Sequence, residues 1–186
     1  MPAALDTLLA IAAGLGLAAA CGFRVFVPLL VVSVAGRAGL IEVHQSFGWI
    51  TSWPTIVCFG VATVLEVGAY YVPVVDNLLD TVATPAAAVA GAVVASAVIV
   101  DVEPWLRWTL VIVAGAGLAT AVQVPTAATR AGSTLTTAGV GNPVVSTGEA
   151  MGAAMLSGLA VFAPVLIPVV LVLLVLFVMR LRPGRA

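Results

Sequence analysis

The chain has 186 residues, of which 62% are hydrophobic and only 8% are charged, and its mean hydropathy is +1.23. Soluble domains carry about 25% charged residues, so this composition excludes an ordinary soluble domain and predicts an integral membrane protein. The formal net charge is -1, which excludes a strongly basic surface for nucleic acid.

Apolar runs of the length needed to cross a bilayer as helices, about 20 residues each, recur along the whole chain. We distinguish about five such runs, and between them there is no room for a sizeable soluble domain. We therefore expect an all-α fold, a polytopic membrane helix bundle that forms a single transmembrane domain over residues 1–186.

The first predicted span covers residues 7–35 and has Gly22, Arg24 and Pro28 in its middle. An uninterrupted helix of this length would be roughly 40 Å long, which exceeds the ~30 Å hydrocarbon core of a bilayer. We expect this span to be broken or strongly kinked at these residues, or to form a partial re-entrant hairpin.

The second predicted span covers residues 53–72, and the polar segment 73–84 follows it. Asp76 and Asp80 lie four residues apart in this segment, so they share one face of a helix whose other face is apolar. We expect a short amphipathic helix at the membrane surface. Its acidic face could offer oxygen ligands to a hard cation, or it could simply be solvated.

The third predicted span, residues 85–100, carries small residues at four-residue spacing that suit close helix packing: Ala87, Gly91 and Ala95. The fourth, residues 108–124, is expected to break at Pro125. Many hydroxyl side chains follow in residues 126–149, for which we expect non-helical backbone against protein or a water-filled cavity.

The fifth predicted span, residues 151–179, is expected to kink at Pro164 and Pro168, because proline removes a helical hydrogen bond. Three arginines follow it, which predicts a cytoplasmic C-terminus by the positive-inside rule.

Two stretches of the chain nearly repeat each other. IAAGLGLAAA at residues 11–20 and IVAGAGLATA at residues 112–121 are identical at seven of ten positions. Five crossings would orient the copies in opposite directions, which predicts an inverted repeat with halves at residues 5–100 and 107–180. In membrane proteins, interrupted hydrophobic segments at corresponding places in two halves point to a binding site.

Ionisable residues inside apolar segments are the main candidates for such a site. Glu66 lies roughly 10 Å inside the second span, where a carboxylate is either functional or part of a structural ion pair with an arginine. Arg24 and Arg130 lie at the two expected breaks and could hold a phosphate or carboxylate through paired hydrogen bonds. Alternatively, they satisfy freed carbonyl groups or pair with Glu66 and Glu149.

The hydroxyl-rich segment adds Asn142 and Ser146, which could line a polar path or belong to a buried structural plug. Cys21 and Cys58 lie in apolar runs and have no metal-site spacing. The chain has no hydrolase, metalloprotease or phosphate-loop motif, so we expect neither an enzyme nor a cofactor.

Three blocks of the chain carry a family resemblance: GFRVFVPLL at residues 22–30, LEVGAYYVPVVDNLLDTVATPAAAVAGA at 65–92, and RAGSTLTTAGVGNPVVSTGEA at 130–150. Together they resemble the motif blocks of a small bacterial integral-membrane family catalogued as domain of unknown function 4126. The resemblance covers roughly residues 12–155 and implies a polytopic membrane protein without an assigned activity. The matching positions are Arg24, Pro28, Glu66, Pro73, Asp76, Asp80, Pro85, Arg130, Asn142, Pro143, Ser146 and Glu149.

The chain departs from the family pattern at three places. Tyr71 and Thr84 stand near positions where the family has basic residues, and Ala150 stands where a second acid is expected. A salt-bridge network implied for the family would therefore be thinner in this chain.

The leading hypothesis is a small membrane transporter or permease for an ion or small solute, with its site at the two broken helices. The alternatives are a lipid-headgroup-binding membrane protein and a non-transporting scaffold or assembly factor. We expect a bacterial cytoplasmic membrane location, the lipid bilayer and a small ion or solute as partners, no nucleic acid, and a homodimer. The residues predicted for the site are Arg24, Glu66, Arg130, Asn142, Ser146 and Glu149.

Overall fold

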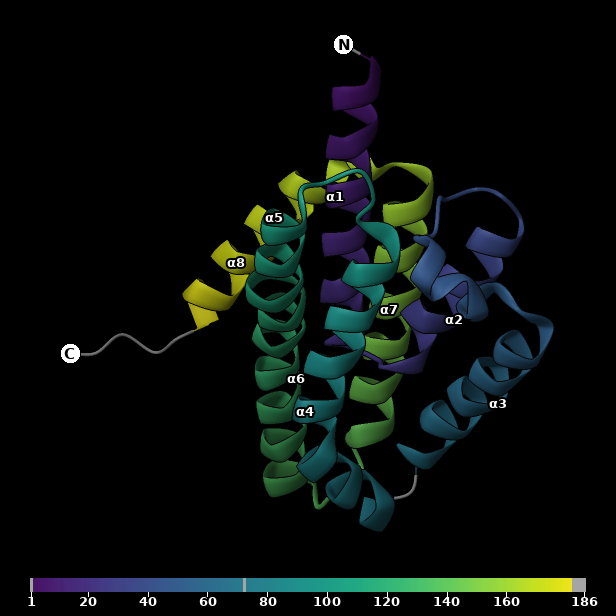
Figure 1. Ribbon diagram of the computed structural model, residues 1–186. Helices are drawn as coiled ribbons and strands as arrows, with labels where there is room; N and C mark the ends of the chain where they lie inside the picture. The colour runs from purple at the N-terminus through teal and green to yellow at the C-terminus, as the bar shows by residue number, and fades with distance from the viewer. Residues whose placement is uncertain (1, 72, 182–186) are drawn as a thin grey trace.

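The computed structural model describes residues 2–71 and 73–181, and the side chains of residues 4–71, 79 and 82–176. Within these residues the chain forms helices and no strand, as Figure 1 shows. The elements in chain order are α1 (Pro2–Cys21), α2 (Phe26–Arg37), η1 (Gln45–Thr51), α3 (Trp53–Ala69), α4 (Pro73–Val98), α5 (Pro104–Thr109), η2 (Leu110–Ala116), α6 (Gly117–Thr137), α7 (Asn142–Phe162), η3 (Pro164–Leu166) and α8 (Ile167–Leu181).

Three helical segments in the described part of the chain are long and apolar enough to cross a membrane: Ala4–Cys21, Pro104–Thr137 and Asn142–Phe162. A fourth is added if η1 and α3, which are bent by 63°, count as one broken span. These apolar helices indicate a membrane protein. The expected number of about five spans is not confirmed.

Helix α1 lies at the centre of the bundle and packs on α4, α6 and α7 (Figure 1). Its residues from Leu17 to Cys21 have no exposed surface. Gly14 and Gly16 allow the close approach, because a Cβ atom on either would lie 2.7 Å from an isoleucine side chain, that of Ile99 or Ile167. Small residues at such crossings let the helix backbones come together.

The small-residue stripe of α4 also packs against a helix. Ala87 and Ala95 have no exposed surface, and a Cβ atom on Gly91 would lie 2.8 Å from the carbonyl oxygen of Gly115. The stripe is therefore the face on which α4 crosses the continuous helix formed by η2 and α6.

The break in the first predicted span is confirmed. Helix α1 ends at Cys21 and α2 begins at Phe26, so Arg24 lies in non-helical backbone between them. A second confirmed interruption lies at Pro164, where η3 separates α7 from α8.

The expected break at Pro125 is wrong, because α6 continues through this residue to Thr137. Hydroxyl side chains in this helix donate to carbonyl oxygens one turn earlier, as Thr129 does to Pro125 (2.9 Å) and Thr137 does to Ser133 (2.7 Å). Such bonds keep polar side chains inside a helix without a non-helical segment. The chain turns instead at residues 138–141, where Ala138 and Gly139 have left-handed backbone, with φ of 52° and 86°.

The expected separate surface helix at residues 73–84 is also wrong. Pro85 lies inside α4, so this segment and the third predicted span form one helix of 26 residues. Proline removes one hydrogen bond without ending a helix when the neighbouring helices hold both flanking segments in place.

The two near-repeats lie side by side, since Ala18 of the first packs in one cluster with Val111 beside the second. Farther along, a Cβ atom on Gly22 would lie 2.4 Å from the carbonyl oxygen of Ala119. Both helices therefore run in the same direction, as Figure 1 also shows, and an inverted repeat is not confirmed.

Candidate functional site

A cluster of charged side chains lies inside the bundle, at the end opposite the N-terminus. Arg24 comes from the α1–α2 break, Arg130 from α6 and Glu149 from α7. The two arginines are 1% exposed and the glutamate is 5% exposed, so the surrounding helices shield all three from lipid. Arg130 and Glu149 each lie seven residues, about 10 Å, from the α6–α7 turn. We call Arg24, Arg130 and Glu149 the charge cluster.

One carboxylate serves both guanidinium groups of the charge cluster. Arg24 Nη2 lies 3.1 Å from Glu149 Oε2, and Arg130 Nε lies 3.3 Å from Glu149 Oε1. Attraction between charges at this separation is far stronger in a low-dielectric interior than in water, and it offsets part of the large cost of removing the charges from water. Glu149 thus links α7 to α6 and to the α1–α2 break.

Arg24 also binds α7 at Ser146. Its Nη2 atom donates to the Ser146 carbonyl oxygen at 3.0 Å and to the Ser146 hydroxyl at 2.5 Å. Every hydrogen-bond and ion-pair contact of this guanidinium in the described residues thus uses one nitrogen, Nη2. Arg24 Nε and Nη1 are buried and have no hydrogen-bond partner among the described residues.

Tyr70, the first residue after α3, completes the cluster on one side. The Cζ atoms of Arg24 and Arg130 lie 4.0 Å and 4.3 Å from the centre of its ring. A desolvated cation over an aromatic ring is stabilised by the ring quadrupole. This contact attaches the C-terminal end of α3, a helix without fully buried residues, to the interior of the bundle.

Glu66 lies near the charge cluster but has a different role in the structure. Its carboxylate accepts hydrogen bonds from the backbone N–H groups of Val25 (2.7 Å) and Phe26 (3.0 Å). The first N–H groups of a helix have no partner within the helix, and a negative charge there also interacts favourably with the helix dipole. Glu66 therefore caps α2 from another helix, since α2 has no side-chain cap of its own.

Asn142 and Ser146 lie on the same side of α7 as Glu149, and both are buried. Asn142 Nδ2 donates to the Thr134 hydroxyl at 2.8 Å, which ties the start of α7 to α6. One turn away, the hydroxyl groups of Tyr71 and Thr147 are 2.7 Å apart. The end of the bundle beyond the charge cluster is therefore lined by hydroxyl and amide groups.

Five of the six residues predicted for the main site lie on α6, α7 and the α1–α2 break. The sixth, Glu66, lies on α3 and places its carboxylate at the start of α2. The expected second acidic face is not described: Asp76 and Asp80 lie in the first turns of α4, but their side chains are outside the described residues.

Sequence reasoning missed two residues of this region. Tyr70, which directly follows α3, was not among the residues predicted for the site, although an aromatic ring at this position can lie against a buried arginine. Gln123, a lone amide in an apolar run of α6, is 2% exposed, and its Nε2 atom has no hydrogen-bond partner. A buried amide in such a run was the available signal.

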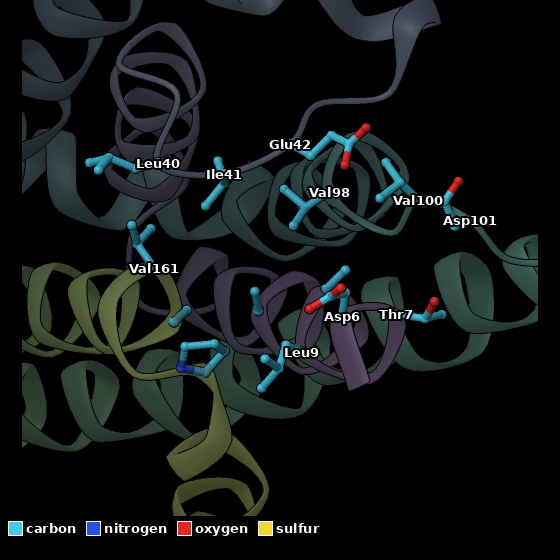
Figure 2. A pocket seen from close by; sticks show the side chains of 14 residues that line it. Asp6, Thr7, Leu9, Leu40, Ile41, Glu42, Val98, Val100, Asp101 and Val161 are labelled. Atoms are coloured by element: carbon cyan, nitrogen blue, oxygen red, sulfur yellow. The ribbon is translucent and has the colours of Figure 1, made fainter. Parts of the chain in front are cut away.

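A hollow of about 310 Å³ lies at the other end of α1. Figure 2 shows Asp6 of α1 and Glu42 of the α2–η1 loop on opposite sides of it, with Asp101 at its edge. These three carboxylates are exposed. The residues described include no group of three potential metal ligands, here or elsewhere.

A family model described as Domain of unknown function (DUF4126) matches residues 11–183, which confirms the resemblance carried by the three sequence blocks. Neither a comparison with curated proteins nor one with solved structures gave a match.

Proposed function

We propose that this chain, which belongs to the DUF4126 family, is a small membrane transporter or permease for an ion or small solute. The observation that carries the proposal is the burial of two guanidinium groups and one carboxylate within a bundle of apolar helices. Ionisable groups at membrane depth are costly, and in membrane proteins they mark substrate and ion pathways.

The position of the charge cluster supports this function over a purely structural one. Arg24 lies in non-helical backbone, and such backbone within a membrane is found where it is covered by protein or lines a cavity. Broken helices with charged or polar groups beside the break form the solute sites of many secondary transporters. The break of α1 and α2 provides one such element.

The arrangement also suggests how the site could change state. Glu149 bridges two arginines on different elements, so its carboxylate can leave one guanidinium while remaining bound to the other. A solute that binds the released guanidinium would then shift the equilibrium between two arrangements of α7 relative to the α1–α2 break. Hydroxyl groups of Thr134, Ser146 and Thr147 provide hydrogen-bonding partners between this site and the nearer end of the bundle.

The environment of the protein is part of the proposal. We place the protein in the bacterial cytoplasmic membrane, as the family resemblance implies, with the lipid bilayer as its surroundings. We propose a cytoplasmic C-terminus, because three arginines follow the last apolar segment. We also propose a homodimer, since a bundle of this size is small for a transporter, and no catalytic activity.

Flux measured with purified protein in liposomes tests the function. Wild-type protein should move at least one member of a panel of protons, alkali cations, halides and small organic anions faster than protein-free liposomes. Glu149→Gln should change that flux at least ten-fold, because it removes the charge shared by the arginines. Glu42→Gln, an exposed carboxylate in a loop, is the matched control and should leave the flux unchanged. Equal flux in wild type, Glu149→Gln and empty liposomes would refute transport.

A further inference from the structure

The Arg24 guanidinium has more hydrogen-bond donors than acceptors around it. The side chain is 1% exposed, and its contacts with Glu149 and Ser146 all use Nη2. Among the side chains and backbone that the structure describes, Nε and Nη1 have no hydrogen-bond partner. A buried cation with unmet donors is unfavourable, so the two nitrogens mark positions where an acceptor from outside the chain would be stabilised.

A further unmet donor lies on the helix that packs against the same break. The Gln123 side chain is 2% exposed, and its Nε2 atom has no hydrogen-bond partner in the described part of the chain. Its turn of α6 contacts the start of the break directly, because a Cβ atom on Gly22 would lie 3.0 Å from the Gln123 backbone nitrogen. Both Arg24 and Gln123 therefore offer N–H groups, and a ligand that satisfies them must supply acceptor oxygens.

Glu149 shows which chemical group the charge cluster accepts. A carboxylate already lies between Arg24 and Arg130, with one oxygen directed to each. Guanidinium groups bind carboxylate and phosphate with similar geometry, because both present paired oxygens to the planar donor set. An external group of the same kind could therefore take the place of the Glu149 oxygen on Arg24.

We propose that the solute of the transport site is a small oxyanion with a carboxylate or phosphate group, which binds Arg24 and competes there with Glu149. This inference rests on the proposed transport function and names its substrate class. Glu149 then competes with the anion for Arg24. It pairs with Arg24 when no anion is bound, and it is displaced from Arg24 when an anion binds. Gln123 is a positioning residue for the anion.

Binding of formate and of inorganic phosphate to the purified protein tests this directly. Either anion should raise the unfolding temperature of the wild type in a concentration-dependent way, since a ligand that binds only the folded state stabilises it. Glu149→Gln should bind the anion at least ten-fold more tightly, because the competing charge is gone. Glu42→Gln should bind as the wild type does.

Three further variants keep the test interpretable if a single change impairs folding. Arg24→Gln should abolish binding. The double variant Arg24→Gln/Glu149→Gln removes the guanidinium and the carboxylate that competes for it, leaves Arg130 as the remaining charge of the cluster, and should not bind either. Gln123→Leu should weaken binding several-fold without changing which anion is preferred. Anion binding that is absent from both wild type and Glu149→Gln, or that persists undiminished in the double variant, would overturn the inference.

The phosphate group could belong to a lipid headgroup or to a free anion, and the two sources differ in their effects. Bound phospholipid should remain after detergent exchange in the wild type but not in the double variant if the headgroup is the ligand. Free formate should stabilise phospholipid-free protein if the ligand is soluble. Retained lipid assigns the oxyanion to the headgroup, and a formate response assigns it to a free solute.

The failure of this inference differs from the failure of the transport function. Flux of cations alone, unaffected by formate or phosphate, would reject the oxyanion and leave transport standing. Anion binding that depends on Arg24, without flux of any solute, would reject transport and leave the binding site standing.

Discussion

Glu66 offers the sharpest test of whether a buried acid in this chain serves structure or transport. Its two carboxylate oxygens accept the backbone N–H groups of Val25 and Phe26 at 2.7 and 3.0 Å. Glu66→Gln keeps one acceptor oxygen, but replaces the other by an NH₂ group that faces a backbone donor. One hydrogen bond is lost, and the remaining bond loses its charge.

The size of the effect follows from these two bonds. A hydrogen bond to a charged group contributes ~1.5–3 kcal/mol and a neutral one ~0.5–1.5 kcal/mol. Because Glu66 is only partly buried, we expect Glu66→Gln to lower the free energy of unfolding by about 2 kcal/mol, and Glu66→Ala by about 3 kcal/mol. Reversible unfolding in mixed detergent micelles, followed by circular dichroism, measures the difference.

Glu103→Gln is the matched control. Glu103 also precedes a helix, α5, but its side chain makes no capping hydrogen bond and is exposed, so the substitution should change stability by less than about 0.5 kcal/mol. Equal stability of the Glu66→Gln and Glu103→Gln variants would refute the capping role. Loss of flux at unchanged stability would instead assign Glu66 to the transport site.

Three further outcomes are expected. Gly22→Ala should lower the free energy of unfolding by ~1–3 kcal/mol, because its Cβ atom would lie 2.4 Å from the Ala119 carbonyl oxygen; Gly132→Ala, where nothing lies within 4 Å, should be neutral or slightly stabilising in the same unfolding assay. Tyr70→Leu should cost ~1–3 kcal/mol through the loss of its two guanidinium contacts, and Tyr70→Phe, which keeps an aromatic ring, should cost less; equal losses would contradict the ring contact. In a double-mutant cycle, Arg24→Gln and Glu149→Gln should each cost ~3–5 kcal/mol, and the double variant should cost clearly less than their sum; additive costs would show that the two side chains do not interact.

The grouping of charged residues could be anticipated from composition alone. A chain with 8% charged residues and long apolar helices must place each buried charge beside an opposite one, because an unpaired charge at that depth is too costly. Pairing of Arg24 and Arg130 with Glu66 and Glu149 was therefore one of the predicted alternatives. Which acid would pair with which arginine could not be predicted, because it depends on how the helices pack.

Local rules failed where neighbouring helices compensate for a helix-breaking residue. Pro85 and Pro125 both predict a helix end, yet each lies within a continuous helix. Hydroxyl groups beside Pro125 bond back to the preceding turn, and the small-residue face of α4 holds the segment after Pro85 against α6. Gly22 and Arg24 do interrupt a helix, because the chain must bend there to bring α2 against α3 and α7.

The orientation of the near-repeats was beyond sequence reasoning. The prediction of opposite directions counted the first predicted span as one crossing, whereas α1 and α2 are separate helices on either side of a break. The small residues that the two copies share are instead explained by helix packing. Gly14 of the first copy and Gly115 of the second both lie against α4, where only small residues fit.

Hydrogen bonds stabilise the non-helical backbone of the α1–α2 break, where Arg24 lies. The N–H groups of Gly22, Phe23 and Arg24 donate back to carbonyl oxygens of α1, and those of the next two residues donate to Glu66. Five consecutive backbone donors are thus satisfied without a helix, so the break imposes no unmet backbone donor at membrane depth. The backbone N–H groups of this segment are all bonded, whereas two nitrogens of the Arg24 side chain have no acceptor among the described residues. A satisfied backbone that presents a guanidinium with remaining donors is the arrangement that the proposed oxyanion site requires.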